Sequence, residues 1–162
     1  MGEKIGVLFV CLGNICRSPL AEGIFLHRAR ERGIVDRFDV DSCGTGAWHV
    51  GERADPRSLA VAARYGIELP SIARQLDAKA DFDRFRWILA MDRSNVRNLM
   101  RAGAPPERVR LLRSFDPALV AKAESALEVP DPYEWGESGF EDTYRMLDAA
   151  CSGLLDFLLD ED

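Results

Sequence analysis

Residues 10–19, with the sequence VCLGNICRSP, are the stretch that most constrains how this chain can fold. Residues 5–10 are apolar and β-branched, which is typical of a buried strand, and residues 19–32 carry apolar side chains at helical spacing. The stretch is therefore predicted to be a turn from a strand into a helix, with Ser18 as the N-cap and Pro19 as the first helical residue. The amides of such a turn converge at the positive end of the helix, which favours binding of an anion.

Cys11 and Arg17 are the two side chains of this turn that can carry chemistry. A helix N-terminus, convergent amides and a nearby cation favour the thiolate form of Cys11, which is the nucleophilic form. The planar guanidinium of Arg17 suits two phosphate oxygens. Gly13 is expected to allow the backbone angles that point amides at a ligand, and Asn14 to hold the loop by side-chain hydrogen bonds. Ser18 can donate its hydroxyl to the Cys11 sulfur.

The C-x5-R spacing by itself is a weak pattern, because a buried structural cysteine can produce it by chance. Here the preceding strand, the following helix and the small and polar loop residues all agree with a binding site. The sequence therefore favours a nucleophile beneath a loop that binds phosphate or another oxyanion. The other loop positions expected to contact the bound group are Leu12, Gly13, Asn14, Ile15, Cys16 and Ser18.

This segment resembles the N-terminal signature of the low-molecular-weight protein tyrosine phosphatases, V-C-x-G-N-I-C-R-S-P. The resemblance extends over nearly the whole chain, so residues 1–162 are expected to form one domain of that family. The further stretches that match in order and spacing are Ser42, residues 44–46, residues 73–75, residues 90–95 and residues 131–133.

Apolar segments alternate with helical patterns, which predicts an α/β fold: a four-stranded parallel sheet with helices on both faces, in three layers and one domain. The strands are expected at residues 5–10, 38–42, 86–91 and 109–112, and the helices at 19–32, 55–66, around 96–100 and 140–159. Residues 115–129 are expected to be a helical excursion. The resemblance adds the strand order 2-1-3-4. The phosphate-binding loop follows the first strand, so the site should lie at the carboxyl ends of the strands.

Composition excludes several classes of function. The chain has 162 residues, of which 47% are hydrophobic, enough for one core. Its 21 basic and 27 acidic side chains give a net charge of −6, which argues against nucleic acid as a partner and leaves no polybasic patch for a membrane. Residues 1–4 lead directly into the first predicted strand without an apolar leader, so we expect a cytoplasmic protein. A monomer is the default expectation.

The four cysteines, at positions 11, 16, 43 and 151, form no C-x-x-C pair, and with two histidines they give no zinc pattern. We therefore expect neither a metal nor a cofactor. Cys16 lies in the same loop as Cys11, which suggests a reversible disulfide that protects the nucleophile under oxidation. The alternative is that Cys16 is simply a small buried side chain.

The resemblance assigns roles to three residues outside the loop. Ser42 is expected to hydrogen-bond beneath the phosphate loop, or else to be an ordinary serine at a strand end. Asp92 is expected either to support the site or to cap the following helix. Trp48 lies among glycines and is expected to form a wall of the substrate slot rather than a core anchor.

Asp131 is the strongest candidate for a general acid. Prolines at positions 130 and 132 flank it and stiffen the backbone, as a positioned acid on a loop requires. Without the Cys11 loop, a turn aspartate would be the simpler interpretation. By resemblance, Tyr133 forms a second aromatic wall. Many family members have a second tyrosine after it, and Glu134 stands there instead, which weakens any expectation of regulation through a tyrosine pair.

Ser71 is another departure from the family pattern. Many members carry a histidine at this position, two residues before Ala-Arg-Gln, and that histidine supports the loop asparagine. The hydrogen bonds behind Asn14 are therefore expected to differ here, with water or a shorter bond in place of the imidazole.

The combined interpretation is a metal-independent protein tyrosine phosphatase that acts on a phosphotyrosine-containing protein or a small aryl phosphate. Cys11 would attack phosphorus and form a cysteinyl phosphate, Arg17 and the loop amides would hold the phosphate oxygens, and Asp131 would act as general acid and then general base.

Three alternatives compete with this interpretation. Arsenate reductases of related fold need a further cysteine pair downstream, and none lies between Cys43 and Cys151. Protein-arginine phosphatases of the family carry threonine where Ile15 stands, so Ile15 favours phosphotyrosine. A phosphate-binding module without catalysis is less favoured, because Cys11, Arg17 and Asp131 are all present.

Overall fold

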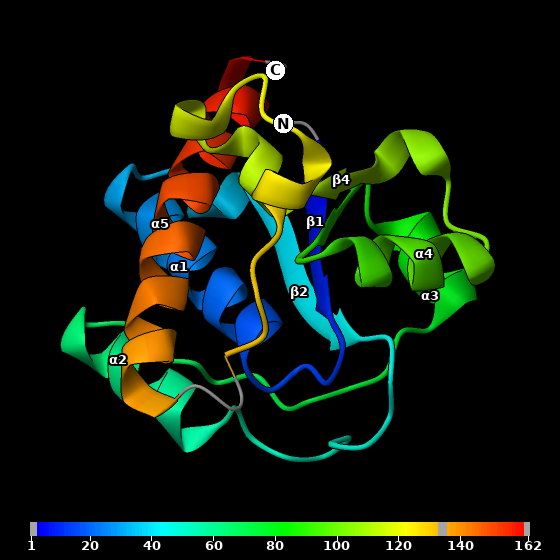
Figure 1. Cartoon of the computed structure of the whole chain (residues 1–162). Helices are drawn as coiled ribbons and strands as arrows, with labels where there is room; N and C mark the ends of the chain where they lie inside the picture. Colours follow the sequence, from blue (N-terminus) through cyan, green and yellow to red (C-terminus); the bar gives the residue numbers. More distant parts are fainter. Residues whose placement is uncertain (1–2, 133–135, 161–162) are drawn as a thin grey trace.

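The computed structural model describes residues 3–132 and 136–160 of the chain. Within them, four parallel strands form one sheet in the order β2-β1-β3-β4 (Figure 1). The strands are β1 (Ile5–Cys11), β2 (Phe38–Gly44), β3 (Trp87–Ala90) and β4 (Val109–Leu111). The predicted α/β class, strand order and strand positions are thereby confirmed, and the strand ends differ from the predicted ends by one or two residues.

Helices cover both faces of the sheet (Figure 1). One face carries α1 (Arg17–Glu31), α2 (Pro56–Arg64) and α5 (Gly136–Asp160), and the other carries α3 (Ala78–Arg84) and α4 (Arg93–Arg101). Successive side chains of β1 point to opposite faces, so Val7 and Phe9 join the core under α1 and α5, while Leu8 and Val10 join the core under α4. A strand that is buried on both faces has to be apolar at every position, which accounts for the continuous run in β1.

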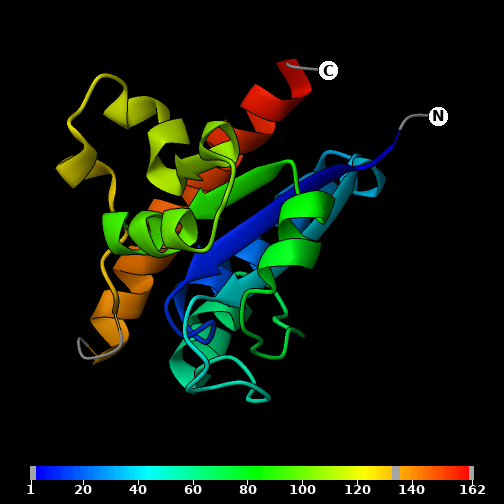
Figure 2. The same ribbon diagram turned by 90° about the vertical axis from the view of Figure 1, so that its right-hand side faces the viewer.

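The carboxyl ends of the strands meet at one end of the molecule. Cys11, the last residue of β1, pairs with Gly44 at the end of β2, and Val10 pairs with Ala90 at the end of β3. The loop after β1, the loop after β2 and residues 129–132 come together at this end, which is the lower end in both ribbon views (Figure 2). The sheet therefore gathers residues that are far apart in the sequence.

The structure corrects three predicted elements. The expected helical excursion at 115–129 is a series of short 3-10 turns, because Pro117 offers no backbone donor and Ala121 takes a left-handed conformation with φ 67. α5 begins at Gly136 and not near residue 140. α3 was not expected, and its N-cap is Asp77, whose side chain accepts the Ala80 amide. The 3-10 turns are η1 (Val35–Arg37), η2 (Pro106–Arg108), η3 (Leu112–Phe115), η4 (Pro117–Leu119) and η5 (Glu124–Leu127).

Within residues 3–132 and 136–160, no helix has the length and apolar character needed to cross a membrane.

Candidate active site

α1 begins at Arg17, with Cys16 at the N-cap position and no side-chain capping bond, so the prediction of Ser18 as the N-cap was wrong. The physical reason is that the Ser18 hydroxyl has other partners. Its Oγ accepts the Asn14 side-chain amide at 2.7 Å and lies 3.0 Å from Cys11 Sγ. Pro19 still falls in the first turn, where a backbone N–H has no helical partner to lose. The first turn of α1 therefore opens onto the loop without a side-chain cap.

Cys11 is the last residue of β1, and only 2% of its surface is exposed. Its Sγ accepts the backbone N–H of Asn14 at 3.3 Å, in addition to the contact with Ser18. Burial raises the pKa of Cys16, Cys43 and Cys151 and keeps these three thiols protonated at neutral pH. All four cysteines are free in the structure, and a Cys11–Cys16 disulfide stays a prediction.

The loop residue with a left-handed backbone is Asn14, at φ 57, and Gly13 has no positive φ. Asparagine adopts this conformation more readily than other residues with a side chain. Gly13 serves a different purpose, because a Cβ there would lie 3.0 Å from Cδ2 of His49. The small size of Gly13 lets the loop after β2 approach the phosphate loop.

Asn14 holds the loop in place through its side chain. Its Nδ2 donates to Ser18 and, at 3.0 Å, to Ser42 Oγ, and its Oδ1 accepts the backbone N–H of Arg74 at 3.0 Å. Ser42 therefore does hydrogen-bond beneath the loop. No histidine is needed behind Asn14, because the backbone of Arg74 and the hydroxyl of Ser42 supply its partners.

Glu22, on α1, is a component of this network that the sequence analysis missed. Ser42 Oγ donates to Glu22 Oε1 at 2.6 Å. Burial raises the pKa of Glu22 to about 7, against the lowering effect of the Ser42 hydrogen bond. The signal that could have revealed it is a glutamate between Ala21 and Gly23, on the part of the helix that packs against the sheet.

α2 anchors the other side of the loop, which the sequence analysis also missed. The Ile15 carbonyl accepts the backbone N–H of Asp55 at 2.8 Å, and the Cys16 carbonyl accepts the Ser58 hydroxyl at 3.3 Å. Asp55 is at the same time the N-cap of α2. The two carbonyls are thereby turned toward α2.

Only 2% of the Arg17 side chain is exposed, and two carboxylates lie close to its guanidinium. Its Nη1 donates to Asp92 Oδ2 at 2.7 Å and to the Val129 carbonyl at 2.9 Å, and its Nη2 lies 3.7 Å from Asp131 Oδ2. Burial lowers the pKa of Arg17, but the Cys11 sulfur and Asp92 outweigh that effect and raise the pKa above its ordinary value. Arg17 is therefore a fixed cation.

Asp92 combines the two roles between which the sequence did not decide. One oxygen bonds Arg17, and the other accepts the Asn95 amide at 2.8 Å in a capping box that begins α4. A single carboxylate thus ties the phosphate loop to the end of β3.

Asp131 reaches the site on a segment that runs past the end of β3. The Val129 N–H donates to the Met91 carbonyl at 2.7 Å, so the segment adds to the carboxyl edge of the sheet. The Asp131 side chain is 46% exposed, in contrast to the buried Arg17 beside it. A half-exposed acid next to a buried cation can exchange protons with water or with a bound ligand.

Trp48 is 72% exposed, which excludes the core-anchor interpretation. Its ring lies against Gly46, and together with Leu12 and Leu76 it lines a hollow of about 420 Å³ beside the loop. This is the kind of wall that the substrate slot requires. Tyr133 and Glu134 lie outside the described residues.

The part of the chain that the structure describes holds no group of three or more histidine, cysteine, aspartate or glutamate side chains with the geometry to bind a metal.

Comparisons with known proteins show the family to which this chain belongs. A family model described as low molecular weight phosphotyrosine protein phosphatase matches residues 6–162. A protein from Streptomyces coelicolor named low molecular weight protein-tyrosine-phosphatase is 48% identical over 153 residues, which are 92% of this chain and 90% of that protein.

Solved structures are similar over the same length. A protein tyrosine phosphatase from Entamoeba histolytica, with Hepes in its active site, is 34% identical with a TM-score of 0.88, covering 98% of this chain and 99% of that one. A Drosophila arginine phosphatase is 31% identical with a TM-score of 0.85, covering 96% of this chain and 99% of that one. The chain belongs to the low molecular weight phosphotyrosine protein phosphatase family.

Proposed function

We propose that this protein hydrolyses phosphotyrosine monoesters through a cysteinyl phosphate on Cys11. The observation that carries the proposal is the meeting of three groups at one loop: the Cys11 sulfur, the buried guanidinium of Arg17, and Asp131 with its carboxylate 3.7 Å from that guanidinium. A nucleophile, a fixed cation and a partly exposed acid are the parts that phosphoryl transfer with protonation of a leaving group requires.

In the first displacement the Cys11 thiolate attacks phosphorus while the bond between phosphorus and the tyrosine oxygen breaks. The Arg17 guanidinium and the amides at the start of α1 take up the charge on the other phosphate oxygens. Protonated Asp131 gives its proton to the departing phenolate. Tyrosine leaves, and the phosphoryl group stays on the sulfur.

In the second displacement a water molecule attacks phosphorus while the sulfur–phosphorus bond breaks. Asp131, now ionised, accepts a proton from that water and returns to its starting form. The Ser18 hydroxyl, 3.0 Å from the sulfur, stabilises the thiolate as it leaves. Inorganic phosphate is released and Cys11 is ready for another turnover.

The walls of the site support an aromatic substrate. A phenyl ring stacks well against an exposed indole, and Trp48 and Leu12 offer apolar surface beside the loop. The substrate is accordingly a phosphotyrosine-containing protein or a small aryl phosphate. We also propose that the enzyme acts as a monomer in the cytoplasm, where a reducing environment preserves its thiol.

Similarity to the Drosophila arginine phosphatase favours one second candidate, hydrolysis of phosphoarginine. Against it stands Ile15, a buried apolar residue at the position where the arginine phosphatases of the family carry threonine.

The test is phosphate release from a phosphotyrosine peptide and a matched phosphoarginine peptide, in reductant and chelator. The wild type is expected to cleave the phosphotyrosine peptide and Cys11→Ser to fall to background. Asp131→Asn should lower turnover of the peptide by about 100-fold or more, because the tyrosine oxygen leaves poorly without a proton. An aryl phosphate with a strongly acidic phenol should lose much less. Full activity in Cys11→Ser, or cleavage of phosphoarginine alone, would contradict the proposal.

A further inference from the structure

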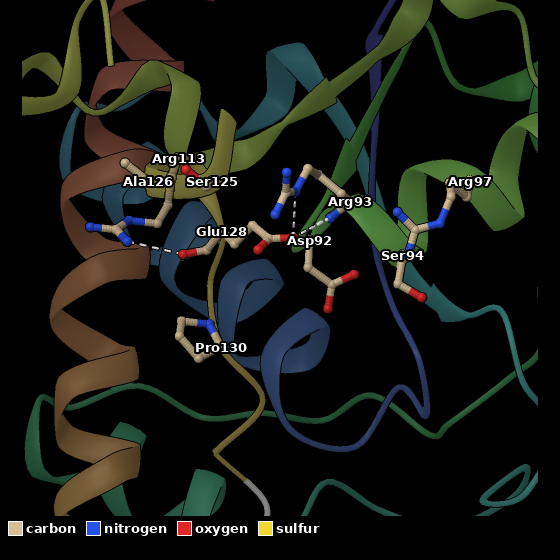
Figure 3. A pocket seen from close by; sticks show the side chains of 9 residues that line it. All are labelled: Asp92, Arg93, Ser94, Arg97, Arg113, Ser125, Ala126, Glu128 and Pro130. Carbon is tan, nitrogen blue, oxygen red and sulfur yellow. Dashed lines mark hydrogen bonds and ion pairs between the residues drawn. The ribbon is translucent and has the colours of Figure 1, made fainter. Parts of the chain in front are cut away.

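A second hollow of about 420 Å³ lies between the first turns of α4 and the segment that carries Asp131 (Figure 3). Its lining residues include Arg93 and Arg97 from α4 and Arg113 from η3. We call it the arginine pocket. Three arginines around one cavity are notable in a chain whose net charge is −6.

The arginine pocket adjoins the reaction centre. One of its walls is Asp92, whose carboxylate bonds Arg17, and another is Pro130, which immediately precedes Asp131. Asp92 therefore lies both at the wall of the arginine pocket and against Arg17 of the phosphate loop. A substrate held in the loop by its phosphotyrosine can therefore place a neighbouring side chain in the arginine pocket.

The carboxylates that line the arginine pocket do not neutralise it. Asp92 already accepts hydrogen bonds from Arg17 and from the backbone N–H of Asn95 at the start of α4. Glu128 already binds Arg93. The Arg93 backbone N–H donates to Glu128 Oε2 at 2.8 Å, and Arg93 Nε donates to the same oxygen at 3.3 Å. The Arg93 amide, with its side chain, holds the pKa of Glu128 below its ordinary value, so Glu128 stays ionised.

Two of the three arginines keep a positive charge that no carboxylate of the pocket offsets. Arg97 is exposed and forms no ion pair within residues 3–132 and 136–160. Arg113 donates to the Glu128 carbonyl at 3.0 Å, and its buried Nε has no hydrogen-bond partner within the described chain. The hydroxyls of Ser94 and Ser125 add further donors at the wall.

The contact between Glu128 and Arg93 shows that a carboxylate fits these walls, since one from the chain itself is already bound there. The hollow beside Trp48 has a more apolar lining, in which Leu12, Leu76 and Ala78 lie beside Gln75, Asn98 and Arg101.

We propose that the arginine pocket binds an anionic group of the substrate, carried by a residue close to the phosphotyrosine. The group is a carboxylate of glutamate or aspartate, or a second phosphate. This inference rests on the proposed function and adds a preference for substrates with an acidic residue near the phosphotyrosine. Arg97 is the residue that forms the ion pair with that acidic group.

The test compares kcat/KM for phosphotyrosine peptides that carry a single glutamate at successive positions on either side, each matched by a glutamine peptide. The wild type is expected to prefer glutamate at one or more positions by about fivefold, the upper range for an exposed ion pair. Arg97→Gln should abolish this ratio, and Arg97→Glu should favour a lysine peptide instead. Higher ionic strength should shrink the preference.

The matched control is Arg30→Gln, which removes the same charge from the exposed far end of α1, about 20 Å along the helix from Arg17. It should keep the wild-type ratio. A phosphoserine peptide in the same series tells whether phosphate is preferred to a carboxylate. Two results would contradict binding of an acidic group in the arginine pocket and leave the proposed function standing. They are equal kcat/KM for glutamate and glutamine peptides in an active wild type, and a glutamate-to-glutamine ratio that is unchanged in Arg97→Gln. Absence of any phosphotyrosine turnover overturns the proposed function as well.

Discussion

A chain of hydrogen bonds links Glu22 to the Cys11 sulfur through Ser42, Asn14 and Ser18, and Asn14 donates toward both ends of it. Ser42 gives its single hydroxyl hydrogen to Glu22, so its oxygen is left to accept from Asn14. Asn14 has two amide hydrogens and donates the second to Ser18. Ser18 can then donate its own hydrogen to the sulfur at 3.0 Å, in preference to the Cys43 carbonyl at 3.5 Å. The Glu22 side chain on α1 thus helps to orient the Ser18 hydroxyl toward the Cys11 sulfur.

The raised pKa of Glu22 predicts a specific dependence of stability on pH. The folded protein holds the Glu22 proton up to about pH 7, whereas the unfolded chain releases it near pH 4.5. Because the folded state binds more protons in that window, the free energy of unfolding should fall as pH rises from about 4.5 to 7, by about 3 kcal/mol in total. Glu22→Gln removes this titration but keeps an oxygen that accepts from Ser42.

Denaturant unfolding of both proteins at pH 5 and pH 8 measures the effect. The difference between wild type and Glu22→Gln cancels the contribution of the other carboxylates, so it should shift in favour of the variant at the higher pH. Parallel stability profiles would show that Glu22 titrates normally in the folded protein.

At the scale of elements, the start of α1 shows what local sequence can and cannot predict. The strand, the loop and the helix follow from apolar periodicity and from the Ser-Pro pair, and the structure contains all three. The N-cap assignment was wrong because the Ser18 hydroxyl contacts Asn14 and Cys11 instead of a backbone N–H of the helix. Both residues lie before α1, and a capping rule considers only the backbone of the helix itself. The turns after β4 were mistaken for a helix for a related reason, since a capped proline turn and a helix start with similar residues.

The close approach of β2 to the phosphate loop gives a prediction about Gly44. A Cβ there would lie 2.7 Å from the Leu12 carbonyl oxygen and 3.2 Å from the Asn14 nitrogen, and both are backbone atoms that cannot turn aside. Gly44→Ala should displace the loop and lower kcat/KM by about tenfold or more, because small misplacements of reacting groups are costly. Overpacking should also lower stability by about 1–3 kcal/mol.

Gly33→Ala is the matched control for Gly44→Ala. Gly33 has φ +71, and a Cβ added there would have nothing within 4 Å, so alanine costs about 1 kcal/mol in backbone strain without touching the loop. It should therefore lose stability and keep full turnover. If Gly44→Ala also kept full turnover, the loop would not depend on the contact with β2.

At the scale of the whole molecule, the site is assembled from parts of the chain that are far apart in sequence. The parallel sheet brings Cys11, Ser42 and Asp92 to one edge because its strands all end there, and that placement could be predicted from the strand pattern. The contacts of Glu22 with Ser42 and of Arg74 with Asn14 depend on how elements pack in three dimensions. Glu22 and Arg74 are charged residues of a kind that is common on surfaces, so the sequence alone does not show that they contact Ser42 and Asn14.

The proposed cysteinyl phosphate on Cys11 is tested most directly by finding which residue holds the phosphoryl group during turnover. The enzyme is mixed with a radiolabelled phosphotyrosine peptide, quenched in acid within milliseconds and digested, and the labelled fragment is identified by mass spectrometry. We expect phosphate on Cys11 in the wild type and no label in Cys11→Ala. Turnover without a covalent phosphate, or a label on any other residue, would contradict it.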